Sequence, residues 1–305
     1  MIKANAQPYR NERVINTGHS NACDGNVRWS AVKSLWFSTM ALGWLIGGAV
    51  YFSWAAVAVF FGLSAIILCL GHSLGMHRKL IHDSFDCPKW VEYIGAYLGT
   101  LVGLGGPLTM VYTHDMRDWA QRQAVCHPFF SHQSSMLKDF WWQIHCKLHL
   151  KHAPQFSYSP SIKSDKFYQC LQVTSMFQQI PLAIILYLMG GWGFVFWGIC
   201  GRVVISIFGH WFIGYFAHNT GHRDWHVKGA AVQGHNVRFC GLITFGECWH
   251  NNHHAFPGSA KLGLQAGQAD PGWWVLIILA KLGIVRSLVL PPELPPRPEL
   301  QKLSA

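Results

Sequence analysis

Histidine is the most unusual residue of this 305-residue chain, because its 18 copies outnumber the 14 acidic residues. The tightest group lies in the segment Glu247-Cys-Trp-His250-Asn-Asn-His253-His254. On a helix, positions i, i+3 and i+4 share one face, so three imidazoles there can bind one metal ion or bridge two. A solvent-exposed histidine face would explain any single pair, but three such residues so close together favour a metal site.

The remaining histidine groups lie where apolar stretches meet polar sequence. His77 and His82 are five residues apart and diverge on an ideal α-helix, which predicts that His82 lies beyond a break in the helix. His114 and Asp118 are four apart, so Asp118 is a ligand, a partner of a ligand or a helix cap. The candidate metal ligands are His77, His82, His114, Asp118, His218, His250, His253 and His254.

The number of these histidines indicates the kind of metal site. Imidazole binds iron, zinc, copper and nickel, and one tetrahedral zinc needs only three or four ligands. The histidines exceed that number, so the count favours two metal ions. Glu247 is expected to orient a ligand imidazole through its other ring nitrogen, with a cap or a structural ion pair as the alternative. Asn251, between the histidines, is the second candidate catalytic residue.

Membrane helices are the elements expected to position these residues. The chain is 50% hydrophobic and only 12% charged, against about 25% charged in ordinary soluble domains. Residues 34–77 contain no Asp, Glu, Lys or Arg, and a second uncharged run covers 167–201 and resumes after Arg202. A spanning helix needs about 20 apolar residues. Four spans are therefore predicted, at about 34–52, 54–72, 171–189 and 192–214.

Charge indicates how these spans are oriented. The turns near Tyr51 and Gly190 lack Lys and Arg, so the positive-inside rule places both termini and the segment 78–166 in the cytosol. Two further apolar stretches, 94–111 and 273–290, are interrupted and are expected to be interfacial or re-entrant. The expected fold is an all-α integral membrane protein, with two helical hairpins under a cytosolic helical cap that holds a histidine-rich di-metal site.

The expected domain organisation follows from this topology. Residues 1–33 form a polar cytosolic tail, and 34–290 form a single domain whose cap comprises 73–170 and 215–290. The Pro-rich tail 291–305 is expected to be poorly ordered. The nine cysteines form no CxxC pair, which predicts reduced thiols.

The formal net charge of +10 bears on partners. It suits anionic lipid headgroups, phosphate-bearing substrates or an acidic electron donor. The hydrophobic runs need lipid rather than water, so nucleic acid is not an expected partner. Basic cap residues are expected to face either the phosphate of CoA or of a carrier protein, or lipid headgroups; they include Arg78, Lys79, Arg117 and Arg122.

These motifs together resemble the membrane-bound fatty acid desaturases, in particular the acyl-CoA Δ9, stearoyl-CoA desaturase-like type. Three histidine boxes define that family. The first resembles His77-Arg-Lys-Leu-Ile-His82, and the third resembles Gly246-Glu-Cys-Trp-His-Asn-Asn-His-His-Ala-Phe-Pro257. The segments His218-Asn-Thr-Gly221 and Asp270-Pro-Gly-Trp273 are also similar to the family. The resemblance runs from about residue 34 to residue 290.

The second box departs from the family pattern His-x-x-His-His, because the chain reads His114-Asp-Met-Arg117-Asp118. The departure makes Asp118 a candidate carboxylate ligand. Four histidines elsewhere are candidates to compensate, although a surface or supporting role is favoured for each: His72, His127, His132 and His222.

The resemblance implies an O2-dependent desaturase that uses two iron ions to insert a cis double bond into a fatty-acyl chain linked to CoA, a carrier or a lipid. It also implies a separate electron donor, such as a ferredoxin, cytochrome b5 or a flavoprotein. A hydroxylase or oxygenase of the same superfamily is the close alternative. A membrane haem electron carrier would place lone histidines in facing spans, and a zinc- or copper-handling membrane protein is a further alternative.

Overall fold

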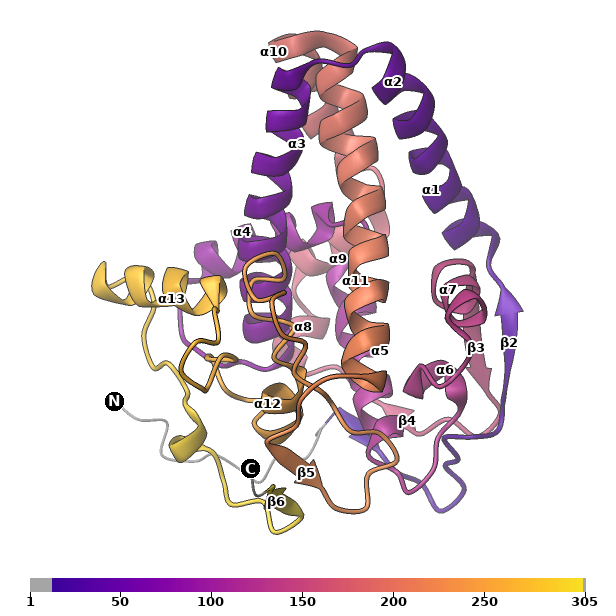
Figure 1. Ribbon diagram of the computed structural model, residues 1–305, viewed down its shortest axis with the longest axis vertical. Coiled ribbons are helices and arrows are strands. Elements are labelled where there is room, and N and C mark those ends of the chain that lie inside the picture. The colour runs from indigo at the N-terminus through magenta and orange to yellow at the C-terminus, as the bar shows by residue number, and fades with distance from the viewer. Residues whose placement is uncertain (1–12, 304–305) are drawn as a thin grey trace.

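The structure is a computed structural model that describes residues 13–303, with long apolar helices at one end and a mixed cap at the other (Figure 1). The first helical rod comprises α1 (Ala31–Leu42), η1 (Gly43–Gly47) and α2 (Gly48–Val50) in direct succession. The second begins at α3 (Trp54–Ile66), whose first turn is capped by the Ser53 hydroxyl accepting from the Ala56 amide at 3.1 Å.

The return helices differ from their predicted boundaries. The segment expected to span the membrane at about 171–189 is divided, because α9 (Lys166–Thr174) ends before α10 (Gln179–Val195) begins. Leu171 packs into a core of the cap rather than among the long helices. The predicted turn at Gly190 is confirmed as a sharp kink, at which Gly191 has φ 67°.

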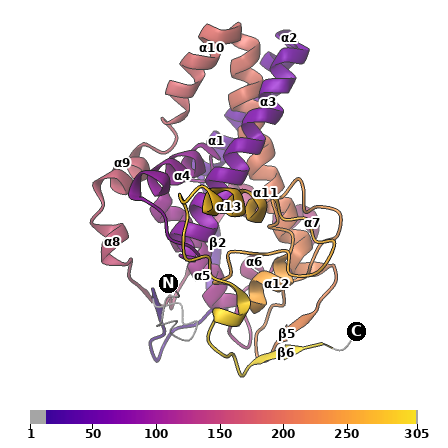
Figure 2. The same cartoon turned by 90° about the vertical axis from the view of Figure 1, so that its left-hand side faces the viewer.

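Beyond the kink, the chain runs through η3 (Phe196–Gly201) into α11 (Arg202–Asn219), which descends to the cap (Figures 1 and 2). Within residues 13–303, two helices are long and apolar enough to cross a membrane, Trp54–Ile81 and the kinked helix Gln179–Asn219. The turns that join the long helices meet at the end opposite the cap (Figure 1).

A π-helix, η2 (Ile67–Ile81), continues α3 into the cap and packs against α4 (Lys89–Leu101). Glycines allow this close approach. A Cβ atom on Gly75 would lie 2.4 Å from the backbone of Gly95, so neither position tolerates a side chain without movement. The stretch 94–111 is divided by a glycine-rich turn, after which α5 (Pro107–Gln121) begins.

Short elements complete the cap. The helical ones are α6 (Pro128–Ser131), α7 (Met136–His145), α8 (Pro160–Lys163), α12 (His250–Ala255), α13 (Pro271–Lys281) and η4 (Pro291–Glu293). Three antiparallel pairs join β1 (Val14–Ile15) to β4 (Gln155–Phe156), β2 (Gly25–Trp29) to β3 (Cys146–Leu150), and β5 (Trp225–Val227) to β6 (Leu300–Lys302).

These pairs correct two expectations. The fold is mostly helical rather than all-α, because the segment before α1 and the C-terminal segment each supply strands to the cap. The described part of the Pro-rich tail holds η4 and β6, and β6 pairs with β5, so it is folded against the cap rather than poorly ordered. Helix α13 lies across the direction of the long helices (Figure 1). All nine cysteines are free thiols, as expected.

Candidate metal centre

Four imidazoles converge where η2 enters the cap. One ring nitrogen from each of His77, His82, His114 and His253 lies within 4.8 Å of the others. They come from η2, the residue that follows it, α5 and α12, so segments far apart in the sequence form one cluster. The ring centroids of His77 and His253 are 4.6 Å apart. We call these residues the four-histidine cluster.

The π-helical turn explains how His77 and His82 come together. His82 follows the last residue of η2, as expected for a position beyond the helix, but the two rings do not diverge. The His82 amide donates to the His77 carbonyl at 3.1 Å. Because this i→i+5 bond places residues five apart above one another, the ring centroids are only 4.8 Å apart.

Three further imidazoles form a second group, the three-histidine cluster of His218, His250 and His254. The Nε2 atom of His250 lies 3.0 Å from Nε2 of both His218 and His254. Helix α12 therefore serves both clusters, since it also carries His253. The ring centroids of His250 and His253 are 5.5 Å apart, so the two clusters adjoin.

The donor set fits transition-metal ions. Loss of hydration lowers the pKa of His82, His253 and His254 well below 6.5 and that of His250 to about 3. These rings are therefore neutral near pH 7, which is the form that binds metal. Nδ1 of His253 is buried and has no hydrogen-bond partner. Four imidazoles suit one ion and three suit a second, which matches the predicted two-metal count.

Glu247 makes the contact expected of a residue that orients a ligand. Its Oε2 lies 2.7 Å from Nδ1 of His77, and its Oε1 accepts a hydrogen bond from Ser73 Oγ at 2.6 Å. Burial alone would raise the pKa of Glu247, but His77 and Arg78 hold it well below its ordinary value. The carboxylate is therefore ionised and directs the other nitrogen of His77 into the cluster.

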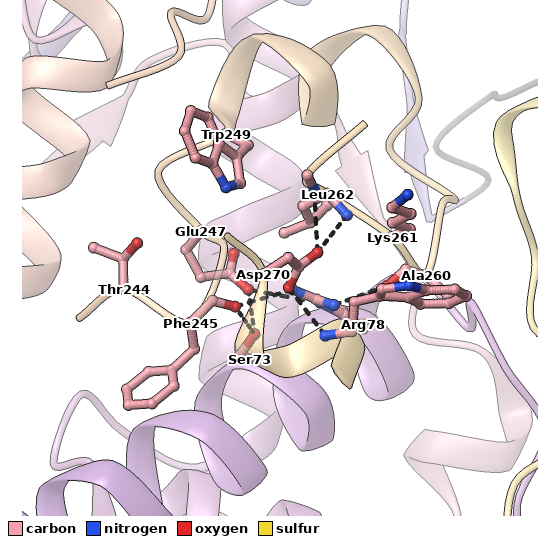
Figure 3. Close-up of polar contacts among 12 residues, drawn as sticks. Ser73, Arg78, Thr244, Phe245, Glu247, Trp249, Ala260, Lys261, Leu262 and Asp270 are labelled. Atoms are coloured by element: carbon pink, nitrogen blue, oxygen red, sulfur yellow. Dashed lines mark hydrogen bonds and ion pairs between the residues drawn. The ribbon is translucent and has the colours of Figure 1, made fainter. Parts of the chain in front are cut away.

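Arg78 is buried beneath this carboxylate, with 1% of its surface exposed (Figure 3). Its guanidinium donates to Asp270 Oδ1 at 2.7 Å and to the carbonyls of Ala260 at 2.8 Å and Phe245 at 3.1 Å. Asp270 in turn accepts from the Leu262 amide at 2.8 Å. The expectation that Arg78 faces a phosphate or lipid headgroups is wrong, because this ion pair ties η2 to the segments around α12 and α13.

Two predicted site residues lie outside the clusters. Asp118 lines a cavity next to both histidine clusters but belongs to neither cluster. Its Oδ1 accepts from Arg122 Nε at 3.2 Å. The Asn251 side chain bonds to backbone groups only, accepting from the amides of Asp224 and Trp225 and donating to the Gly234 carbonyl. Asn251 therefore holds the chain beyond α11 against α12, and its catalytic role stays a prediction.

The four compensating candidates occupy different places. His72 lines the cavity, and its ring centroid lies 5.1 Å from that of His210. His127 caps α6 and His222 pairs with Asp224, so neither belongs to a cluster. His132 stacks on His218 with ring centroids 5.1 Å apart.

A cavity of about 180 Å³ adjoins both clusters, and its apolar wall includes Ile81, Met110, Ile213 and Ala217. Its volume suits part of a long chain rather than a whole drug-sized ligand, for which pockets start at roughly 300 Å³. Sequence reasoning missed His210 in this wall. The spacing of eight residues from His218 on α11 would have indicated a shared helix face.

The two long apolar helices bring His77 and His218 to histidine clusters that could hold metal ions, which indicates a membrane protein with a metal-binding site. The similarity of the chain to known proteins agrees with this class. The chain is 34% identical over 249 residues to the sn-2 palmitoyl-lipid 9-desaturase of Nostoc sp. (strain 36), covering 79% of this chain and 84% of the relative. It is 36% identical over 265 residues to the sn-1 stearoyl-lipid 9-desaturase of Anabaena variabilis, covering 84% and 94%.

A plant relative widens this set. The acyl-CoA C20 Delta5-desaturase of Anemone leveillei is 30% identical over 251 residues, covering 80% of this chain and 77% of the relative. No protein-family model matches the chain. The chain belongs to the fatty acid desaturase family and is an oxidoreductase, as the histidine boxes predicted.

Proposed function

We propose that the protein uses O2 to insert a cis double bond into a saturated fatty-acyl chain linked to a lipid, CoA or a carrier. The observation that carries this proposal is the convergence of seven imidazoles from four separate segments, six of which line one cavity with an apolar wall. By their names, the relatives from Nostoc and Anabaena act on lipid-linked chains, whereas the Anemone relative acts on an acyl-CoA.

Two iron ions are the proposed cofactor. The four-histidine cluster would hold one ion and the three-histidine cluster the other. Asp118 is the proposed carboxylate ligand, and it would bind the metal while its Oδ1 pairs with Arg122 Nε at 3.2 Å. Iron supplies, together with O2, an oxidant strong enough to remove hydrogen from an unactivated methylene, which no side chain can provide.

The protein's own residues would orient the ligands and exclude water. Glu247 Oε2 lies 2.7 Å from Nδ1 of His77, and the Gly214 carbonyl lies 2.7 Å from Nδ1 of His218 on α11. Both rings then present Nε2 to the centre. Ile81, Met110 and Ile213 form an apolar surface on which a chain segment would lie in a fixed orientation, away from bulk water.

The proposed topology has four spans and a cytosolic cap. Residues 31–50 and 54–81 form one hairpin, and the rod Gln179–Asn219, kinked at Gly190, forms the other. Because the turns at the far end lack Lys and Arg, both termini and the metal centre would be cytosolic. Residues 34–290 would be the single catalytic domain. The electron donor would be a separate protein: a ferredoxin, cytochrome b5 or a flavoprotein.

Lipid analysis of a host that expresses the chain tests this function, with His253→Ala as the matched control. We expect new monounsaturated chains from the native protein only, each lacking two hydrogen atoms relative to its saturated precursor. Products that gain one oxygen atom would instead show a hydroxylase. Unchanged lipids, from native protein that contains iron and receives electrons, would refute the proposal.

A further inference from the structure

A chain of polar contacts runs from the cavity wall into the interior of the cap. Arg117 lines the cavity on α5, and its Nη1 lies 2.7 Å from Nε2 of His132. The opposite nitrogen of that ring, Nδ1, lies 2.8 Å from Oδ2 of Asp139 on α7. His132 has 1% of its surface exposed and Asp139 has none. These contacts form a relay of fixed polarity inside the protein.

Hydrogen-bond chemistry determines the form of His132 in this relay. A guanidinium has donors and no acceptor, so Nε2 of His132 must accept from Arg117. The hydrogen of the neutral ring is then on Nδ1, where it is donated to Asp139. Arg117 also donates to Gln143 Oε1 at 2.7 Å, which holds the guanidinium in place from a second side. The ring of His132 is therefore fixed in both tautomer and orientation.

The relay returns to the helix that carries a predicted metal ligand. Trp211 Nε1 on α11 donates to Asp139 Oδ2 at 2.9 Å. His218 lies seven residues later, on the same face of α11. The ring of His132 stacks on that of His218 with a centroid separation of 5.1 Å and an interplanar angle of 14°. His132 is thus held against one flat face of His218.

We infer that Arg117 and His132 are positioning residues that set the plane of the His218 imidazole for metal binding. The Gly214 carbonyl engages Nδ1 of His218, and the stacked ring of His132 blocks rotation about the remaining side-chain torsion. Nε2 of His218 is then directed at Nε2 of His250, 3.0 Å away. This inference rests on the proposed function, because it assigns the relay to one of two metal positions.

The four-histidine cluster provides an internal reference for a test. His132 contacts the three-histidine cluster directly through His218, whereas the hydrogen bonds of its ring run to Arg117 and Asp139, which lie outside the four-histidine cluster. Loss of the relay should therefore lower the iron affinity of the three-histidine cluster and leave that of the four-histidine cluster unchanged. Residues that orient a metal ligand typically change metal affinity by about 10–100-fold.

The experiment compares iron binding by the purified full-length chain and three variants, using iron titration and Mössbauer spectra. Arg117→Met removes the donor, Arg117→Lys restores one, and His132→Phe keeps a flat ring without its hydrogen bonds. We expect native protein to bind two irons. Arg117→Met and His132→Phe should bind one with native affinity and the other about 10–100-fold more weakly. Arg117→Lys should recover most of the second site.

The control is His127→Ala, because His127 caps α6 beside the relay but touches neither cluster. It should bind both irons as the native chain does. Two irons of native affinity in Arg117→Met would overturn the inference, and so would an equal weakening of both sites in folded protein. If Arg117→Met fails to fold, His132→Phe decides by the same outcomes. Native protein without iron would instead refute the proposed function.

Discussion

The two histidine clusters adjoin each other but are supported in different ways. In the four-histidine cluster, carboxylates back the rings: Glu247 lies 2.7 Å from His77, and Asp115 lies 3.4 Å from His114. In the three-histidine cluster, a neutral backbone carbonyl and a stacked ring support His218. A carboxylate makes an imidazole a stronger donor, so the first position should bind metal more tightly than the second.

The number of ligands sharpens this contrast, and one substitution in each cluster tests it. His254→Ala leaves two imidazoles, and we expect that iron to be lost, whereas His114→Ala leaves three and should retain a weakened ion. Both variants should lose at least about 100-fold in desaturation, because one intact position cannot replace the pair. Metal analysis of purified protein beside product analysis measures both effects. Equal iron contents would remove the proposed asymmetry.

The carboxylate itself provides the next test. Glu247→Gln keeps the shape of the side chain but removes its charge, so His77 loses its ionised partner. We expect iron to bind about 10–100-fold more weakly at the four-histidine cluster, with no change at the other. Iron titration followed by Mössbauer spectroscopy would separate the two positions. Cys240→Ser, in the same loop but outside both clusters, is the control. Weakening of both positions would contradict the local role of Glu247.

The two clusters also differ in how far sequence reasoning could reach. Helical periodicity was enough to place His250, His253 and His254 together, because α12 is a regular helix. It was not enough for His77 and His82, whose proximity depends on a π-helix. That helix packs glycine against glycine on α4, a tertiary contact that local spacing does not encode.

Buried contacts between distant segments were the other limit. The basic charge of the cap suggested that Arg78 and Arg117 face a phosphate or lipid headgroups. Their partners, Asp270 and His132, are 192 and 15 residues away. Such pairs form only when the cap folds and brings the two segments together. Composition therefore cannot distinguish a buried guanidinium from an exposed one.

A change of pH should affect both clusters in the metal-free chain. The pKa of His250 is lowered to about 3 from 6.5, and that of His253 is also well below 6.5. Below about pH 6.5 the unfolded chain therefore binds more protons than the folded chain. The free energy of unfolding is highest above that pH and falls as the solution is acidified. Thermal unfolding of metal-free protein between about pH 7.5 and pH 5 measures this loss. A midpoint that is constant across this window would contradict the neutral state of the rings.

The smallest expected effect concerns a contact that both clusters share through α12. Arg297 in the C-terminal segment donates to the carbonyls of His254 and Ala255, each at 2.8 Å, at the end of that helix. Arg297→Ala should lower the free energy of unfolding by about 1–3 kcal/mol, because two carbonyls lose a charged hydrogen-bond donor. Since α12 supplies ligands to both positions, the iron affinity of both should fall by the same small factor. The apparent melting temperature should fall by a few degrees. Arg297→Lys, which can still donate, is the matched control. Selective loss of one iron in Arg297→Ala would show that the C-terminal segment serves one cluster rather than the helix they share.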